Sequence, residues 1–252
     1  FTRSITRGRY SYIAFRYPQE YEALMWIQRN LPDDAVILEA TGDITMEDLS
    51  GNLLDLDLGW DGSQRGSLTL RSLSGGVIFL GADDLVRTGG GSLVIEAATD
   101  VILNAEIRSA RGDVTITSSG GQIQLNHANG INSNDGNLTL TAATSVELWG
   151  DLDASGPAGE GDVQIVGNVN FWADISIEGF DVSIVGATSG SDALGLNGQN
   201  DITIGPLSSG NLTVSSTAGN ITVGGDLNAE SVNVTAAAGD VETLLTRADL
   251  DN

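Results

Sequence analysis

A short motif, Gly-x-(Leu/Val)-x-(Leu/Ile/Val), returns along most of the chain and limits the folds that the chain can adopt. The clear copies are GSLTL at 66, GSLVI at 91, GDVTI at 112, GNLTL at 136 and GDVQI at 161. Looser copies are FDVSI at 180, GNLTV at 210 and ESVNV at 230. The copies start roughly 23 residues apart, which is a period typical of solenoid proteins.

A second run with alternating apolar residues follows the first within each period, as in GVIFL at 76, DVILN at 100, SVELW at 145, DITI at 201 and NITV at 220. Two strands of about five residues per period cannot form a helical repeat, which needs ~34 residues. We therefore predict an all-β parallel solenoid of about eight coils, with equivalent strands ~4.8 Å apart and with continuous internal stacks of Leu, Ile and Val. The longest loops are expected at 55–65, 81–90, 150–161 and 186–200.

The outward positions of the first strand are mostly polar and are expected to line up along the solenoid axis. They are Thr69, Val94, Thr115, Thr139, Gln164, Ser183, Thr213 and Asn233.

Residues 1–40 do not follow the repeat. The stretch PQEYEALMWIQRNLPDD begins at Pro18, places Tyr21, Leu24 and Leu31 on helical spacing, and stops at Pro32. We predict a short amphipathic α-helix that caps the first coil, because an open solenoid end exposes apolar side chains and an unpaired strand edge. The alternative is a junction to an unrelated upstream segment. The predicted domains are thus a basic N-terminal segment with the capping helix, 1–40, and the repeat domain, 41–252.

The charge of the chain bears on its partners. The formal net charge is -23, which disfavours nucleic acid as a partner of the repeat region because phosphate binding depends on Lys and Arg. The absence of cysteine excludes disulfides, thiolate metal sites and a cysteine nucleophile. No apolar run approaches the ~18 residues of a membrane helix, and no signal peptide is visible. Because the chain begins at Phe1, we expect it to start inside a longer precursor.

No set of residues forms a recognisable catalytic motif. His127 has no motif partners and is interpreted as a turn residue. Two clusters of carboxylates in glycine-rich loops could serve as acid and base in polysaccharide cleavage, but solvated turn residues are the simpler interpretation. The clusters are Asp55, Asp57 and Asp61, and Asp83 and Asp84. We predict no catalytic or cofactor-binding residue and no enzymatic activity.

One loop partly matches a calcium-binding pattern. In DLDASGPAGEGD, four oxygen-bearing residues fall at positions typical of an EF-hand: Asp151, Asp153, Ser155 and Asp162. An EF-hand is flanked by helices and ends in Glu, whereas strands are predicted on both sides here. These residues are weak calcium candidates, and an ordinary loop without metal or other cofactor is favoured.

Two tryptophans fall at the same phase of successive coils. If Val146 and Leu148 point inward, Trp149 points outward, and Trp172 takes the equivalent position one coil later. The two indoles are expected to stack and to form an aromatic ledge that could hold a sugar ring or a partner protein. The interpretation that we favour is that they pack over a corner of the coil.

The repeats resemble those of filamentous haemagglutinin-like exoproteins of two-partner secretion over about 40–243. The resemblance rests on GDITMEDLSGNLL, GGGSLVIEAATDVILNAEIRSARGDVTITSSGG, GNLTLTAATSVEL and GDLDASGPAGEGDVQI. It implies a right-handed parallel β-helix, export through an outer-membrane transporter, and adhesion to a host or neighbouring cell surface through glycan or protein. A shorter stretch, 21–43, weakly resembles a family of large uncharacterised membrane proteins and suggests a fusion at this end.

We therefore expect a structural, adhesive stalk segment of a large secreted or cell-surface bacterial exoprotein. Two alternatives stay open. One is a polysaccharide-processing β-helix enzyme, and the other is a surface-layer or filament subunit that assembles end to end.

Overall fold

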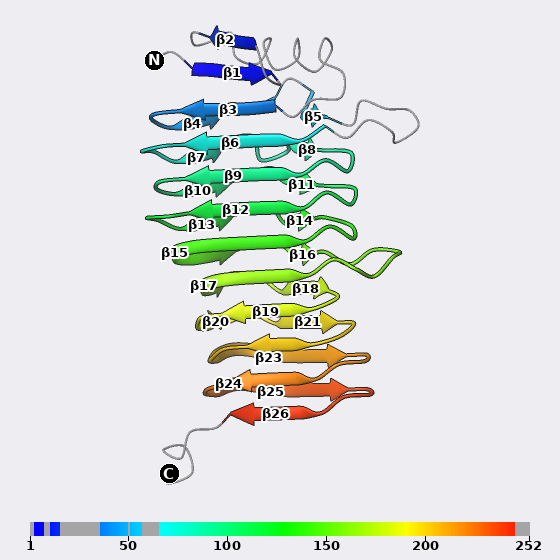
Figure 1. The fold of residues 1–252 in the computed structure, drawn as a ribbon. Helices are drawn as coiled ribbons and strands as arrows, with labels where there is room; N and C mark the ends of the chain where they lie inside the picture. Colours follow the sequence, from blue (N-terminus) through cyan, green and yellow to red (C-terminus); the bar gives the residue numbers. More distant parts are fainter. Residues whose placement is uncertain (1–2, 8–10, 16–35, 50, 57–65, 245–252) are drawn as a thin grey trace.

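The computed structural model describes residues 3–7, 11–15, 36–49, 51–56 and 66–244. In these residues the chain winds into a parallel β-solenoid whose strands stack in register along one axis (Figure 1). Within the described part, the path from β6 to β26 makes about eight turns, and β3, β4 and β5 form one turn before it. The predicted all-β parallel solenoid is thus confirmed. The described residues contain no helix, and the predicted capping helix lies outside them.

Each turn has three faces, which we name in chain order. The first face consists of β3 (Val36–Ala40), β6 (Leu68–Ser72), β9 (Leu93–Ala97), β12 (Val114–Ser118), the first halves of β15 (Leu138–Leu148) and β17 (Val163–Phe171), β19 (Val182–Val185), β22 (Ile202–Ile204), β24 (Ile221–Gly224) and β26 (Val241–Leu244).

The second face consists of β4 (Ile44–Met46), β7 (Val77–Phe79), β10 (Val101–Leu103), β13 (Ile123–Leu125), the second halves of β15 and β17, β20 (Thr188–Gly190), and the first halves of β23 (Leu207–Ser216) and β25 (Leu227–Ala236).

The third face consists of β5 (Leu53–Asp55), β8 (Leu85–Arg87), β11 (Glu106–Arg108), β14 (Ile131–Asn132), β16 (Leu152–Asp153), β18 (Ile175–Gly179), β21 (Leu194–Gly198), and the second halves of β23 and β25.

The prediction of two strands per period was wrong, because each turn has a third face, and several of the missed strands lie in segments expected to be loops. The stretch 81–90 contains β8, 150–161 contains β16, and 186–200 contains β20 and β21. The strands β8, β14 and β16 each turn a single large apolar residue inward, namely Val86, Ile131 and Leu152. A strand with a single inward residue shows no alternation, so the period-two pattern cannot reveal it.

The face assigned to the last repeats was also wrong. GNLTV and ESVNV, expected on the first face, lie on the third, where Leu212 pairs with Leu194 and Val232 with Leu212. DITI and NITV lie on the first face instead, so Thr203 and Thr222 continue the outward row in place of Thr213 and Asn233. Alternation shows which side chains point inward, but it does not show on which of the three faces a strand lies.

The interior is a set of apolar columns that run along the axis. On the first face, Leu93, Val114 and Leu138 stack with no exposed surface. Small buried residues turn the corner between the first and second faces, and they are Ala40, Ser72, Ala97, Ser118 and Ala142. The Ser118 hydroxyl donates to the Thr99 carbonyl and accepts from the Gly121 N–H, so it pairs backbone groups that the corner leaves unpaired.

The glycine of the motif permits a close approach between turns. A Cβ on Gly112 would lie 2.0 Å from the carbonyl oxygen of Gly91, and one on Gly136 would lie 2.3 Å from that of Gly112. Side chains do not fit at such distances, so glycine recurs for steric reasons at the corner between the third face and the first face of the next turn.

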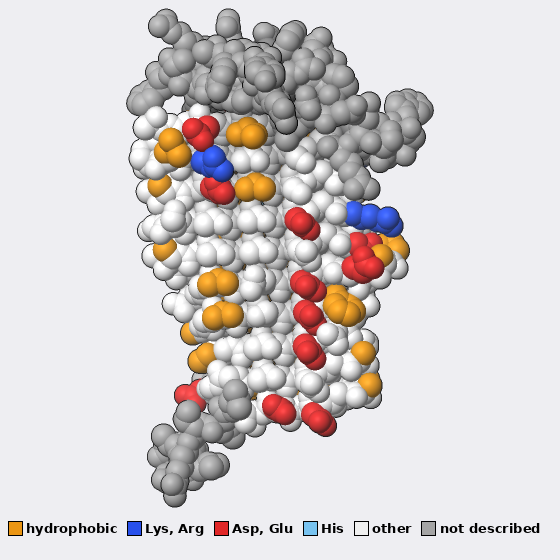
Figure 2. Space-filling view, viewed as in Figure 1, with side chains coloured by type: hydrophobic (Ala, Val, Ile, Leu, Met, Phe, Trp, Pro, Cys, Tyr) orange, Lys and Arg blue, Asp and Glu red, His pale blue; other side chains and the backbone are white. Residues whose placement is uncertain are grey.

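The next motif position forms a hydrogen-bonded ladder along the same corner, which we call the Asx ladder. In each rung a side-chain Oδ1 accepts the backbone N–H of the equivalent residue one turn on, over 2.7–3.1 Å. Its members are Asp113, Asn137, Asp162, Asp181, Asp201, Asn220 and Asp240. Figure 2 shows acidic side chains in a row along the long axis of the molecule.

A hairpin covers the N-terminal edge of the solenoid. β1 (Arg3–Arg7) pairs antiparallel with β2 (Ser11–Phe15) on one side and with β3 on the other. The backbone edge of β3, which would otherwise be open, is thus paired. β3 itself pairs in parallel with β6, so the solenoid ladder already includes 36–40.

We predict that Asp181 stabilises the Asx ladder as an acceptor and not through its charge. Its Oδ1 accepts the Asp201 N–H at 2.8 Å and the Asn200 amide at 2.9 Å. Asp181→Ala should lower the free energy of unfolding by about 1–2 kcal/mol. Asp181→Asn keeps the acceptor and removes repulsion from Asp162 and Asp201, so it should be neutral or stabilising at low salt.

Urea unfolding at low and high ionic strength measures both variants. Equal destabilisation by Asp181→Asn and Asp181→Ala would show that the carboxylate charge, and not the acceptor, matters.

Candidate functional site

The two tryptophans lie where the second face ends. Leu148 pairs with Leu125 and Phe171 with Leu148, so the residues that follow, Trp149 and Trp172, are equivalent in adjacent turns. Their backbone N–H groups continue the parallel ladder, with Trp149 donating to Leu125 O and Trp172 to Leu148 O, both at 3.0 Å. Asn126 precedes them in the same column and donates to Asn104 Oδ1 at 2.8 Å.

The indoles form an offset stack. Their ring centroids are 5.9 Å apart and their planes differ by 20°, which lies in the range of favourable aromatic pairs. Trp149 is 36% exposed and Trp172 is 58% exposed, so neither is buried over the corner. We call the pair the tryptophan ledge.

A carboxylate fixes the orientation of the ledge. The Trp172 Nε1–H donates to Glu147 Oε2 at 2.8 Å. Glu147 Oε1 accepts from Ser145 Oγ at 2.6 Å and from Asn170 Nδ2 at 2.8 Å. Burial would raise the pKa of Glu147, but the hydrogen bonds from Ser145, Asn170 and Trp172 outweigh it and lower the pKa. Glu147 is thus a buried, ionised anchor for the Trp172 ring.

The sequence did not single out Glu147. The alternating pattern places it outward, two residues before Trp149, where a glutamate is usually solvated. It is only 8% exposed because the Trp172 indole reaches back to it from the next turn. Its position two residues before a surface tryptophan was the only signal available.

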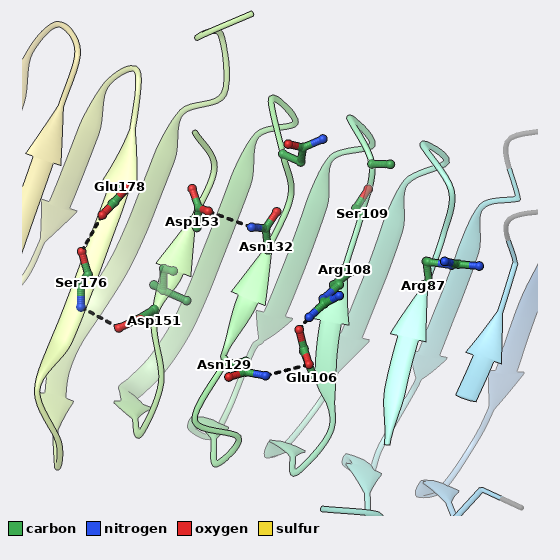
Figure 3. Close-up of a pocket in the computed structure, with 13 residues that line it drawn as sticks. Arg87, Glu106, Arg108, Ser109, Asn129, Asn132, Asp151, Asp153, Ser176 and Glu178 are labelled. Atoms are coloured by element: carbon green, nitrogen blue, oxygen red, sulfur yellow. Dashed lines mark hydrogen bonds and ion pairs between the residues drawn. The ribbon is translucent and has the colours of Figure 1, made fainter. Parts of the chain in front are cut away.

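A polar groove of about 560 Å³ runs along the third face (Figure 3). Its lining includes two arginines, which lie on β8 and β11. It also includes four carboxylates, which lie from β11 to β18. These residues are Arg87, Arg108, Glu106, Asp151, Asp153 and Glu178.

The groove carboxylates are held by separate hydrogen bonds. Glu106 accepts from Arg108 and from Asn129 Nδ2, and Asp153 accepts from Asn132 Nδ2 at 2.8 Å. Glu178 accepts from Ser176 Oγ at 3.0 Å. These contacts join neighbouring residues of the solenoid surface, as the dashed lines in Figure 3 show.

Of the four calcium candidates, the structure shows a direct hydrogen bond only between Asp153 and Ser155. Asp151 Oδ1 accepts the Ser176 N–H, Asp153 Oδ1 accepts from Ser155, and Asp162 Oδ1 accepts the Asp181 N–H in the Asx ladder. In the described part of the chain no group of three His, Cys, Asp or Glu residues could hold a metal ion.

The carboxylates considered for polysaccharide cleavage lie in two places, Asp55 at the end of β5 and Asp83 and Asp84 in the turn before β8. Asp55 forms an ion pair with Arg87. Asp84 is buried at 2% exposure and accepts the Leu49 N–H, and burial raises its pKa, as do the nearby charges of Asp48 and Asp83. Asp57 and Asp61 lie outside the described residues.

The single histidine forms a local turn contact. His127 Nδ1 accepts the Asn129 N–H at 3.1 Å, in agreement with its interpretation as a turn residue.

Comparison with known proteins gives no match: no family model, curated protein or solved structure matches the chain. Among the described residues, no helix has the length and hydrophobicity needed to cross a membrane.

We predict that Glu147 makes the stability of the solenoid depend on pH. Because its pKa is lowered in the folded state, its contribution is complete above the ordinary glutamate value of about 4.5 and is lost as the pH falls through the lowered pKa. In Glu147→Gln, the free energy of unfolding should fall less between about pH 6 and about pH 3 than in the parent.

Denaturant unfolding across this range, with Glu178→Gln as the control, measures the difference. An identical pH dependence in parent and Glu147→Gln would contradict the assignment of Glu147 as an ionised anchor.

Proposed function

We propose that the chain is a rigid, right-handed stalk segment of a secreted or cell-surface bacterial exoprotein, which holds loops or distal domains away from the cell for attachment. The observation that carries the proposal is the continuity of the ladder on all three faces. Strand pairing and the apolar columns continue from turn to turn along the axis.

Continuity of this kind favours a mechanical role. Bending the rod would have to break backbone hydrogen bonds on one face or compress a close-packed column on another. The hydrogen bonds of Glu106, Asp153 and Glu178 to neighbouring side chains also favour a structural use of the groove over a catalytic one. Acidity supports the same role, since a net charge of -23 keeps a long repeat protein soluble and limits edge-to-edge association.

The cellular setting rests on the sequence. The resemblance of 40–243 to filamentous haemagglutinin-like repeats supports export through an outer-membrane transporter and adhesion to a host or neighbouring cell surface. The partner in this proposal is a glycan or protein of that surface.

Surface labelling tests the proposal. Antibodies raised against the chain should label intact cells of the organism that produces it, or detect the protein in the medium, without permeabilisation. A cytoplasmic control protein should be labelled only after permeabilisation. Labelling of the chain that also requires permeabilisation would contradict the proposal.

An end-to-end filament subunit is the second candidate, and β25 and β26 favour it. Val232 and Val241 occupy positions that are buried in earlier turns but are 48% and 47% exposed. Apolar side chains beside a strand edge are a template for a second copy.

Light scattering distinguishes this candidate from a monomeric stalk. Filament formation predicts a mass that rises with concentration, and Val232→Asp should abolish the rise, because it places a charge in the contact. The exposed substitution Val185→Asp, on β19 away from this end, is the control. A constant monomer mass would exclude the filament.

A further inference from the structure

We propose that the tryptophan ledge is a saccharide-binding site, in which the uncovered face of the Trp172 indole stacks against a pyranose ring. Nothing in the stalk proposal requires this site. Surface labelling and saccharide binding can therefore succeed or fail separately.

One face of the stack is available because the column changes from large to small residues. Trp149 covers one side of Trp172. On the other side, Phe171 pairs with Gly190, so the position after Trp172 in the column is Ser191. Both Ser189 and Ser191 are exposed. A large ring is thus followed by a turn of small residues, which leaves room for a flat ligand about the size of a sugar.

The small residue at position 190 has a structural cause. A Cβ there would lie 2.4 Å from Cε2 of Phe171, so the buried ring of Phe171 requires glycine. Gly190 thus lies over the buried ring of Phe171, and the residue that follows it, Ser191, takes the outward position after Trp172.

The orientation of Trp172 is set before any ligand binds. Its Nε1–H is held by Glu147, which is held in turn by Ser145 and Asn170. A ring fixed in this way loses little conformational freedom on binding, and preorganisation of this kind raises affinity. Glu147 is a positioning residue here, because its oxygens already accept hydrogen bonds from the protein.

Polar groups at the rim suit hydroxyl groups of a sugar. Ser189 Oγ donates to Asn170 Oδ1 at 2.7 Å, and Ser191 Oγ donates to Asp192 Oδ2 at 3.1 Å. These oxygens keep acceptor capacity for ligand hydroxyls. Glu147, Asp174 and Asp192 give this region negative charge, so the geometry points to neutral or amino sugars and not to uronic or sialic acids.

Calorimetric titration of the whole chain with three probes tests the proposal: cellohexaose as a neutral saccharide, a chitosan hexamer as an amino saccharide, and hexagalacturonate as an acidic one. We expect one of the first two to bind and the third not to bind. Trp172→Ala should lower the association constant by about fivefold or more, since a stacking contact is worth about 1 kcal/mol or more.

Leu80→Ala is the matched control. Leu80 lies in the same column and is 48% exposed, so its loss removes exposed apolar surface of the same column without touching the ledge. A second variant, Ser191→Trp, leaves the stack intact but places an indole over the free face of Trp172, and it should block binding without loss of stability.

Three outcomes would overturn the proposal. They are no binding of the neutral or amino saccharide at millimolar concentration, binding that Trp172→Ala and Ser191→Trp leave unchanged, and binding of the acidic saccharide at least as tight as that of the other two. If Trp172→Ala lowers the unfolding midpoint and saccharide binding is absent from the parent, the ledge is a packing element.

Discussion

Parallel pairing between successive turns is the constraint on which the rest of the structure depends. It places every residue directly over its equivalent, ~4.8 Å along the axis. Each position of the repeat therefore forms a column along the axis, and the side chains of one column must pack against one another. Glycine repeats where the chain approaches the turn before, leucine and valine repeat inside, and Asp or Asn repeats where a side chain can accept the next N–H.

Stacking of equivalent residues also places like charges next to one another. The surroundings of these charges differ between the early turns and the Asx ladder. In the early turns, Arg71 lies between Glu39 and Glu96 of the neighbouring turns and contacts both, and Arg108 forms an ion pair with Glu106 of its own strand. In the Asx ladder, Asp162, Asp181 and Asp201 follow one another without a cation between them. Two unit charges 4 Å apart in water repel by about 1 kcal/mol, whereas a hydrogen bond to a charged group contributes about 1.5–3 kcal/mol. The hydrogen bond to the carboxylate therefore outweighs the repulsion by a small margin. Asn137 and Asn220 accept the next N–H as neutral groups and add no repulsion.

The sequence predicted those features in which one residue type repeats with a fixed phase. The inward columns, the outward row from Thr69 to Ser183 and the equivalence of Trp149 and Trp172 all follow from alternation and period. It did not predict the third face, because strands such as β14 and β16 are two residues long. It did not predict Glu147 as a buried anchor either, since that burial is created by an indole from the following turn.

The Glu147 anchor also bears on why tryptophan occupies this column. A corner that needs only to be covered can use an aliphatic side chain. Leu80, four turns before Trp172 in the same column, is such a side chain and needs no hydrogen bond. Covering Glu147 instead removes a carboxylate from water, which is unfavourable unless other donors replace the water. Ser145, Asn170 and the indole itself supply those donors, and the lowered pKa shows that they more than compensate for burial. Three donors thus hold Glu147 in place, and Glu147 holds the exposed Trp172 ring at a fixed angle. A fixed exposed ring is what a stacking ligand needs and what simple packing does not require.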